Sequence, residues 1–121
     1  MKTVIEPKNQ DSILAQWRGA CAQIWIFDVS LKRVAIRIYR PHEAELLYVI
    51  AVGCNHITGP FSWDGANLSI SLDTSDSLRP NARRVVDDGV GFELRCSDAK
   101  VVRGPSTDFD KTFEDFLAEG K

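Results

Sequence analysis

The chain has 121 residues, 44% of them hydrophobic and 26% charged, a composition typical of one globular domain rather than a disordered chain. A domain of this size buries enough apolar surface to fold without disulfides or structural metals. The net charge of −2 excludes a strong overall attraction to nucleic acid or anionic membranes.

The chain is expected to begin with a lead-in and a short helix. Residues 1–10 are polar and are predicted to be mobile. Ile13 and Trp17 recur at helical spacing, which predicts a helix over residues 11–19. Gly19 suits the left-handed position at the end of that helix.

Three strands are predicted next, over residues 21–29, 33–40 and 43–54. Apolar residues alternate with polar ones in 33–40, and the short connection before it predicts an antiparallel hairpin with 21–29. Residues 43–54 are apolar on both faces. Their β-branched content favours a buried strand over a helix.

The second half of the chain predicts more strands. Residues 68–73 alternate as a half-exposed strand does. Residues 82–97 predict a hairpin that turns at Asp88-Gly89. Residues 99–104 predict a last short strand.

A C-terminal helix is predicted over residues 106–121, because its apolar side chains share one helical stripe. The members of the stripe are Phe109, Phe113, Phe116 and Leu117. The whole pattern predicts an α+β fold: an antiparallel sheet of about six or seven meandering strands, with an N-terminal and a C-terminal helix packed on one face. No linker or repeat divides the chain, so residues 1–121 are expected to form a single domain.

The segment GCNHITGPFSW, residues 53–63, gathers a thiol, an imidazole and a tryptophan. Cys54 as nucleophile and His56 as base are the catalytic candidates. Their side chains diverge if the chain turns between them, and no third group is positioned to orient the base, so the pattern favours a structural loop. We expect Phe61 and Trp63 to plug the core, and His56 to be the only member near solvent.

Other chemistry finds less support in the sequence. Carboxylates at Asp64, Asp87 and Asp88 stand beside glycines in predicted turns, where they typically bind the backbone. No glycine-rich loop leads into a helix, so no phosphate site and no cofactor are predicted. The paired spacing of structural zinc ligands is also missing, so no metal is predicted. The residues weighed as metal ligands are Cys54, His56, Cys96 and His42.

The candidate binding residues lie mainly on the outward face of the strand at 33–40. They are Arg33, Arg37, Tyr39 and Arg40, with His56 from the loop. Basic and aromatic side chains on a sheet can hold an acidic protein surface or a single-stranded nucleic acid. The acidic net charge disfavours nucleic acid, so a protein partner or self-association is expected.

The leading hypothesis is a non-catalytic protein-interaction or binding module. One alternative is a thiol-dependent hydrolase or transferase that uses Cys54 and His56, and another is a carrier of a small apolar ligand. Three cysteines without a CxxC pair, a polar N-terminus and no membrane-length apolar run predict a cytoplasmic protein with free thiols.

Overall fold

The computed structural model describes residues 3–28, 30, 32–73 and 82–105. Within them the chain forms a 3-10 helix, η1 (Pro7–Asn9), an α-helix, α1 (Gln10–Gln16), and ten strands. The strands are β1 (Thr3–Ile5), β2 (Cys21–Asp28), β3 (Arg33–Tyr39), β4 (Glu45–Val52), β5 (His56–Thr58), β6 (Ser62–Trp63), β7 (Ser69–Leu72), β8 (Arg83–Asp87), β9 (Phe92–Cys96) and β10 (Asp98–Pro105).

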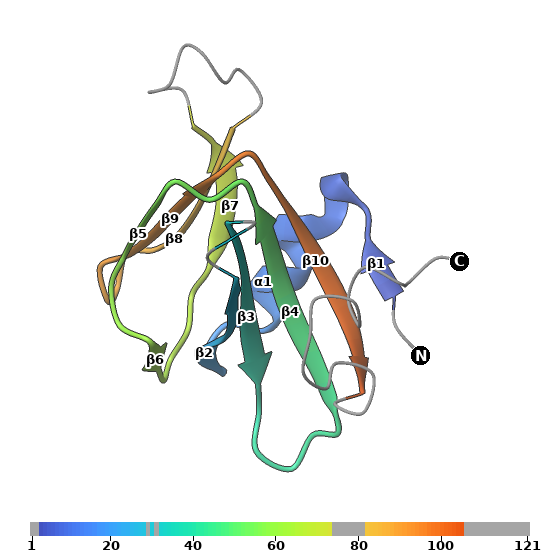
Figure 1. Cartoon of the computed structure of the whole chain (residues 1–121). Coiled ribbons are helices and arrows are strands. Elements are labelled where there is room, and N and C mark those ends of the chain that lie inside the picture. The colour runs from blue at the N-terminus through green and yellow to red at the C-terminus, as the bar shows by residue number, and fades with distance from the viewer. Residues whose placement is uncertain (1–2, 29, 31, 74–81, 106–121) are drawn as a thin grey trace.

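The strands form two antiparallel sheets (Figure 1). The first sheet has six strands in the order β1-β10-β4-β3-β2-β6, and the second has four in the order β5-β9-β8-β7. After β4 the chain crosses to the edge of the second sheet as β5, and it returns to the first sheet as β6. β10 then inserts between β1 and β4, so strands from both ends of the described chain are neighbours.

The main hydrophobic core lies between the two sheets. β3 contributes Val34, Ile36 and Ile38, as its alternating sequence predicts, and β9 contributes Leu94 from the facing sheet. α1 packs against the same core, which also contains Trp17 just beyond the helix. Burial of each large side chain stabilises the fold by about 1.5–3 kcal/mol, so this interior holds the sheets together.

A second buried cluster lies on the outer face of the first sheet, because β4 is apolar on both faces. Its buried members come from β3, β4 and β10: Ala35, Leu46, Tyr48, Ile50 and Val102. Trp25 and Tyr39 pack beside them. Burial raises the pKa of Tyr48 to about 12, so its hydroxyl stays protonated at neutral pH.

The predicted fold class is wrong. The described chain contains two sheets and one short α-helix near its start, rather than one meandering sheet clasped by two helices. The meander fails because the chain changes sheet twice around β5, and because β10 pairs with β4, more than forty residues earlier in the chain. The helix predicted over residues 106–121 lies outside the described residues.

Several local predictions are confirmed. β2 and β3 form the expected antiparallel hairpin, and β4 is a buried strand. β8 and β9 form the expected hairpin around Asp88-Gly89. Helix α1 lies within one residue of the predicted start, and Gly19 has the predicted left-handed backbone with φ +93°.

The N-terminal residues continue the first sheet. Thr3–Ile5 pair with Val101–Arg103 of β10, and η1 follows directly. The two described helices have three and seven residues, and neither has the length or apolar character to cross a lipid bilayer.

Candidate functional site

Residues 53–63, singled out in the sequence, carry the chain from one sheet to the other and back. Two glycines in left-handed conformations permit the crossing: Gly53 has φ +63° and Gly59 has φ +120°. At Gly59 a Cβ atom would lie 2.8 Å from the Cα of Phe92, so the loop can approach β9 only without a side chain.

Trp63 anchors the return to the first sheet, as predicted. Its ring is 8% exposed and lies 4.8 Å from the ring of Phe92, centroid to centroid. Its indole Nε1 donates a 2.8 Å hydrogen bond to Oδ2 of Asp87, which is also buried. Asp87 further accepts bonds from the backbone amides of Asn67 and Gly89, so this carboxylate ties both sheets together.

The prediction for the rest of the loop is wrong. Phe61 is 80% exposed and Ile57 is 42% exposed, so neither plugs the core and His56 is not the only member near solvent. Phe61 lies beyond the edge of β2, where its carbonyl accepts a hydrogen bond from the amide of Ile24. Its side chain therefore has no sheet surface to pack against among the described residues.

Cys54 and His56 make contacts in different places. Cys54 packs against the main core, and its amide donates to the carbonyl of Lys32 at 2.8 Å. The His56 imidazole lies 3.4 Å from the Thr58 hydroxyl and 3.8 Å from Glu93 Oε1. A thiolate and its base must share a hydrogen bond, and these contacts do not provide one.

A cleft of about 370 Å³ opens beside these residues, between the β2–β3 hairpin and β5. We call it the edge cleft. Its walls are mainly apolar and are formed by Phe27, Val34, Cys54, Ile57 and Leu94. Phe27 is 57% exposed, so two large apolar side chains, Phe27 and Ile57, stand open to solvent in one hollow.

The edges of two strands border the edge cleft. β2 pairs with β6 only through Ala22 and Gln23, followed by the Ile24–Phe61 hydrogen bond. Within the described chain, Trp25–Phe27 have no neighbouring strand on that side. β5 likewise pairs with β9 alone.

The predicted row of basic residues divides into separate contacts. The Arg33 guanidinium lies 2.6 Å from the Asp28 carboxylate. Arg37 lies over the rings of Trp25 and Tyr39, at 4.1 and 4.8 Å from their centroids, on the outer face of the first sheet. These contacts occupy both guanidinium groups within the fold.

Arg40 lies apart from the other two arginines. It stacks over Trp17 at 4.4 Å and donates to the carbonyl of Gln16, so it covers the end of α1. A binding role for Arg33, Arg37, Tyr39, Arg40 and His56 stays a prediction.

One of the turn carboxylates weighed in the sequence, Asp64, contacts a cysteine. The Cys21 thiol donates to Asp64, and the Asp64 carboxylate raises the pKa of that thiol above its usual value. No group of three or more potential metal-binding side chains occurs in the part of the chain that the structure describes.

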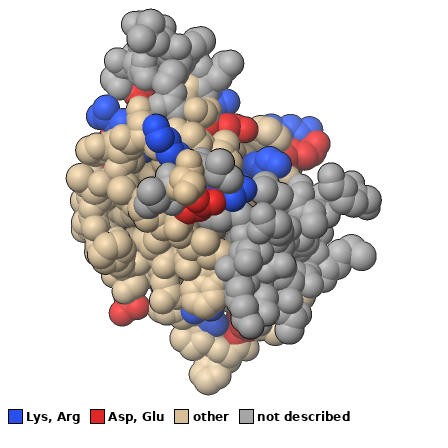
Figure 2. All heavy atoms as spheres, in the orientation of Figure 1, with Lys and Arg blue, Asp and Glu red and all other residues tan. Residues whose placement is uncertain are grey.

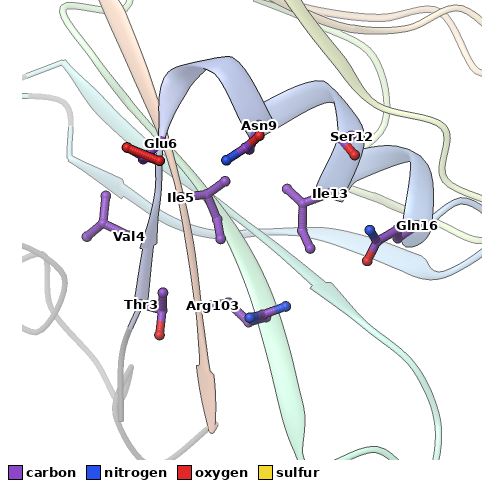
Figure 3. Close-up of a pocket in the computed structure, with 9 residues that line it drawn as sticks. All are labelled: Thr3, Val4, Ile5, Glu6, Asn9, Ser12, Ile13, Gln16 and Arg103. Atoms are coloured by element: carbon purple, nitrogen blue, oxygen red, sulfur yellow. The ribbon is translucent and has the colours of Figure 1, made fainter.

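A second hollow of about 420 Å³ lies between β1 and α1 (Figure 3). Ile5 and Ile13 point toward one another across it, and polar side chains such as Asn9 and Gln16 line its rim. Its one guanidinium, on Arg103, lies 3.7 Å from Glu45. The rim of this second hollow is polar and its arginine is already paired, whereas the edge cleft exposes two large apolar side chains. We therefore place the candidate site at the edge cleft.

Comparison with protein-family models, curated proteins and solved structures finds no match. In the view of Figure 2, charged side chains of the two signs are intermixed, and a broad uncharged region lies to the left, where Figure 1 places β5 and β6.

The sequence did not reveal the residues that define this cleft. Strict alternation places Phe27 on the face of Trp25, but the β2–β3 pairing shifts register between Ile24 and Ile26, which sets Phe27 opposite Val34 on the face toward the second sheet. Nothing local in the sequence shows this shift. Lys32 stands in a hairpin turn, where a lysine is ordinary. The signal in the sequence is the concentration of apolar residues in 57–63, of which Phe61 and Trp63 are predicted to lie in the core.

Proposed function

We propose that this protein is a non-catalytic interaction module that binds an extended polypeptide segment at the edge cleft. The observation that carries the proposal is the pair Phe27 and Ile57, which are large, solvent-exposed and together in one hollow. Exposed apolar side chains grouped in a concave surface typically mark an interaction site.

The strand edges support an extended ligand. The unpaired stretch of β2 over Trp25–Phe27 offers backbone donors and acceptors, which a peptide can use by adding a strand to the sheet. A peptide in this position has side chains pointing alternately to each face, so one set enters the cleft beside Phe27 and Ile57. Main-chain bonds then supply affinity, and the apolar walls supply selectivity.

The exposed areas limit the strength of binding. Full burial of a large apolar side chain contributes about 1.5–3 kcal/mol, so covering the exposed parts of Phe27 and Ile57 contributes about 2 kcal/mol. Association itself costs an estimated 4–15 kcal/mol in lost freedom of motion. Backbone hydrogen bonds contribute about 0.5–1.5 kcal/mol each and must supply the remainder, so we expect weak binding.

A carrier of a small apolar ligand is the second candidate, and the size of the cleft favours it. About 370 Å³ falls within the roughly 300–1,000 Å³ of small-molecule sites. A thermal-shift screen of fatty acids and apolar metabolites separates the two functions, because a carrier is stabilised by a free ligand and a strand-binding module by peptides.

Selection from a phage-displayed library of random linear peptides tests the main proposal. The wild-type protein is expected to enrich peptides that share apolar residues at alternate positions. Ile57→Lys, which places a charge in the cleft, is expected to abolish enrichment.

The matched control is Leu72→Lys. Leu72 is also a large, exposed apolar residue, 56% exposed, but it lies on β7 at the opposite edge of the second sheet. This variant is expected to enrich the same peptides as the wild type. Equal loss in both variants, or no shared pattern with the wild type, would reject the cleft as the binding site.

A further inference from the structure

Among the described residues that line the edge cleft, Lys32 is the one with a permanent charge. Lys32 and His56 both line it, and no Asp or Glu is among its described lining residues. We infer that the segment bound here is acidic as well as apolar, with a carboxylate beside the side chain that enters the cleft. This inference rests on the proposed function and specifies the chemistry of its partner.

Lys32 places a positively charged side chain at the rim of the edge cleft. Its carbonyl accepts the hydrogen bond from the Cys54 amide, which fixes this part of the turn against the crossing segment. No ion pair within the described residues engages its ammonium group. The nearest carboxylate in sequence, Asp28, is already paired with Arg33 at 2.6 Å.

His56 stands at the edge of a second group of basic residues. Glu93, the one carboxylate in that group, lies 2.7 Å from Arg84 and 3.3 Å from Arg95. The Arg84 hydrogen bond, followed by the contribution of Arg95, holds the pKa of Glu93 below its usual range. The group of Arg84, Arg95 and Glu93 therefore carries two permanent positive charges against one negative charge.

This arrangement discriminates between peptides. An acidic side chain near Lys32 gains an attractive interaction, whereas a basic one meets a like charge in a hollow with apolar walls. A neutral apolar peptide retains the hydrophobic contacts only. The preference is expected to be moderate, because Lys32 is exposed and water screens the interaction.

The test compares selections from one random peptide library on the wild type, Lys32→Glu, Lys32→Gln and Lys100→Glu. The wild type is expected to enrich apolar peptides with Asp or Glu. Lys32→Glu is expected to keep the apolar pattern but to change the enriched charge from acidic to basic, and Lys32→Gln to lose the charge preference. Lys100 is an exposed lysine of β10 outside the cleft, so Lys100→Glu is expected to behave as the wild type.

Fluorescence anisotropy gives the size of the effect. A selected peptide and its copy with Asn and Gln in place of the acidic residues are titrated with the wild-type protein. We expect the acidic form to bind about three- to tenfold more tightly at low salt, with the difference shrinking as salt screens the charges.

The outcomes separate the two proposals. Enrichment of apolar peptides without any charge preference, or an unchanged preference in Lys32→Glu, overturns the acidic partner and leaves the interaction module standing. No enrichment at all with the wild type overturns both. If light scattering instead shows that the chain dimerises and that Ile57→Lys makes it monomeric, a second copy of the chain is the occupant of the edge cleft, and the acidic peptide is overturned.

Discussion

Replacement of Asp87 by alanine is expected to weaken the joint between the two sheets. Its carboxylate is 1% exposed and accepts three hydrogen bonds, from Trp63 Nε1 at 2.8 Å, the Asn67 amide at 2.8 Å and the Gly89 amide at 3.1 Å. Alanine leaves three donors without their acceptor. A buried donor without a partner costs about 1–3 kcal/mol.

The expected loss is smaller than three full penalties. Asn67 and Gly89 are exposed residues, so water can reach their amides, whereas Trp63 is buried. We therefore expect Asp87→Ala to lower the free energy of unfolding by about 2–4 kcal/mol. A domain stable by about 5–15 kcal/mol stays folded after this loss. Asp87→Asn keeps one oxygen but turns an NH₂ group toward a donor, and is expected to cost about half as much.

Urea denaturation followed by tryptophan fluorescence measures the effect. With a slope of about 1–3 kcal/mol per molar urea, the midpoint of Asp87→Ala should fall by about 1–2 M. Trp63→Phe removes the indole donor together with part of the buried ring, and the packing loss is the same with or without Asp87. The Asp87→Ala/Trp63→Phe double variant should therefore cost at least about 1 kcal/mol less than the sum of the single variants. Additive costs, or a loss below 1 kcal/mol for Asp87→Ala, would refute the role of this carboxylate.

Three further predictions concern the loop, the surface charges and the thiols. Gly59→Ala is expected to destabilise the fold by about 1–3 kcal/mol, because φ is +120° and the new Cβ would lie 2.8 Å from the Phe92 backbone. The control is Gly65→Ala, where φ is +66° and the space around the residue is open. This variant should lower the free energy of unfolding by less in the same urea assay. The pKa of Glu93 is lowered chiefly by the hydrogen bond from Arg84, so the stability that the carboxylate contributes is present above the ordinary carboxyl pKa and is lost as pH falls through the lowered value. The free energy of unfolding of Glu93→Gln should therefore differ from that of the wild type by less than about 1 kcal/mol at pH 7. This difference should vanish in acid. Iodoacetamide at pH 7 is expected to modify Cys54 no faster than free cysteine and to leave buried Cys96 intact, whereas rapid modification of Cys54 would favour the thiol enzyme.

The elements that the sequence predicted correctly are the ones set by local patterns. The alternation in 33–40 and the Asp88-Gly89 turn specify a strand and a hairpin without reference to the rest of the chain. The division into two sheets depends on pairings between distant residues, such as Val102 with Tyr48. One sequence carries no direct signal for such pairings, and consecutive strands are usually neighbours, so the sequence predicts a simple meander.

The candidate site was only partly predictable for the same reason. Reactive residues drew attention to 53–63, and Trp63 was placed correctly in the core. Whether Phe27, Ile57 and Phe61 are buried depends on where the opposing sheet ends, which their own neighbours do not determine. An apolar residue expected in a core can thus become part of an exposed surface.

Amide hydrogen exchange with and without a selected peptide tests whether a peptide adds a strand at the edge cleft. Strand addition at the edge cleft predicts that the peptide slows exchange at Trp25–Phe27 of β2, with smaller changes in β5 and none in β7 at the far edge of the second sheet. Unchanged exchange along β2 in the presence of saturating peptide, or protection centred on any other element, would contradict the account.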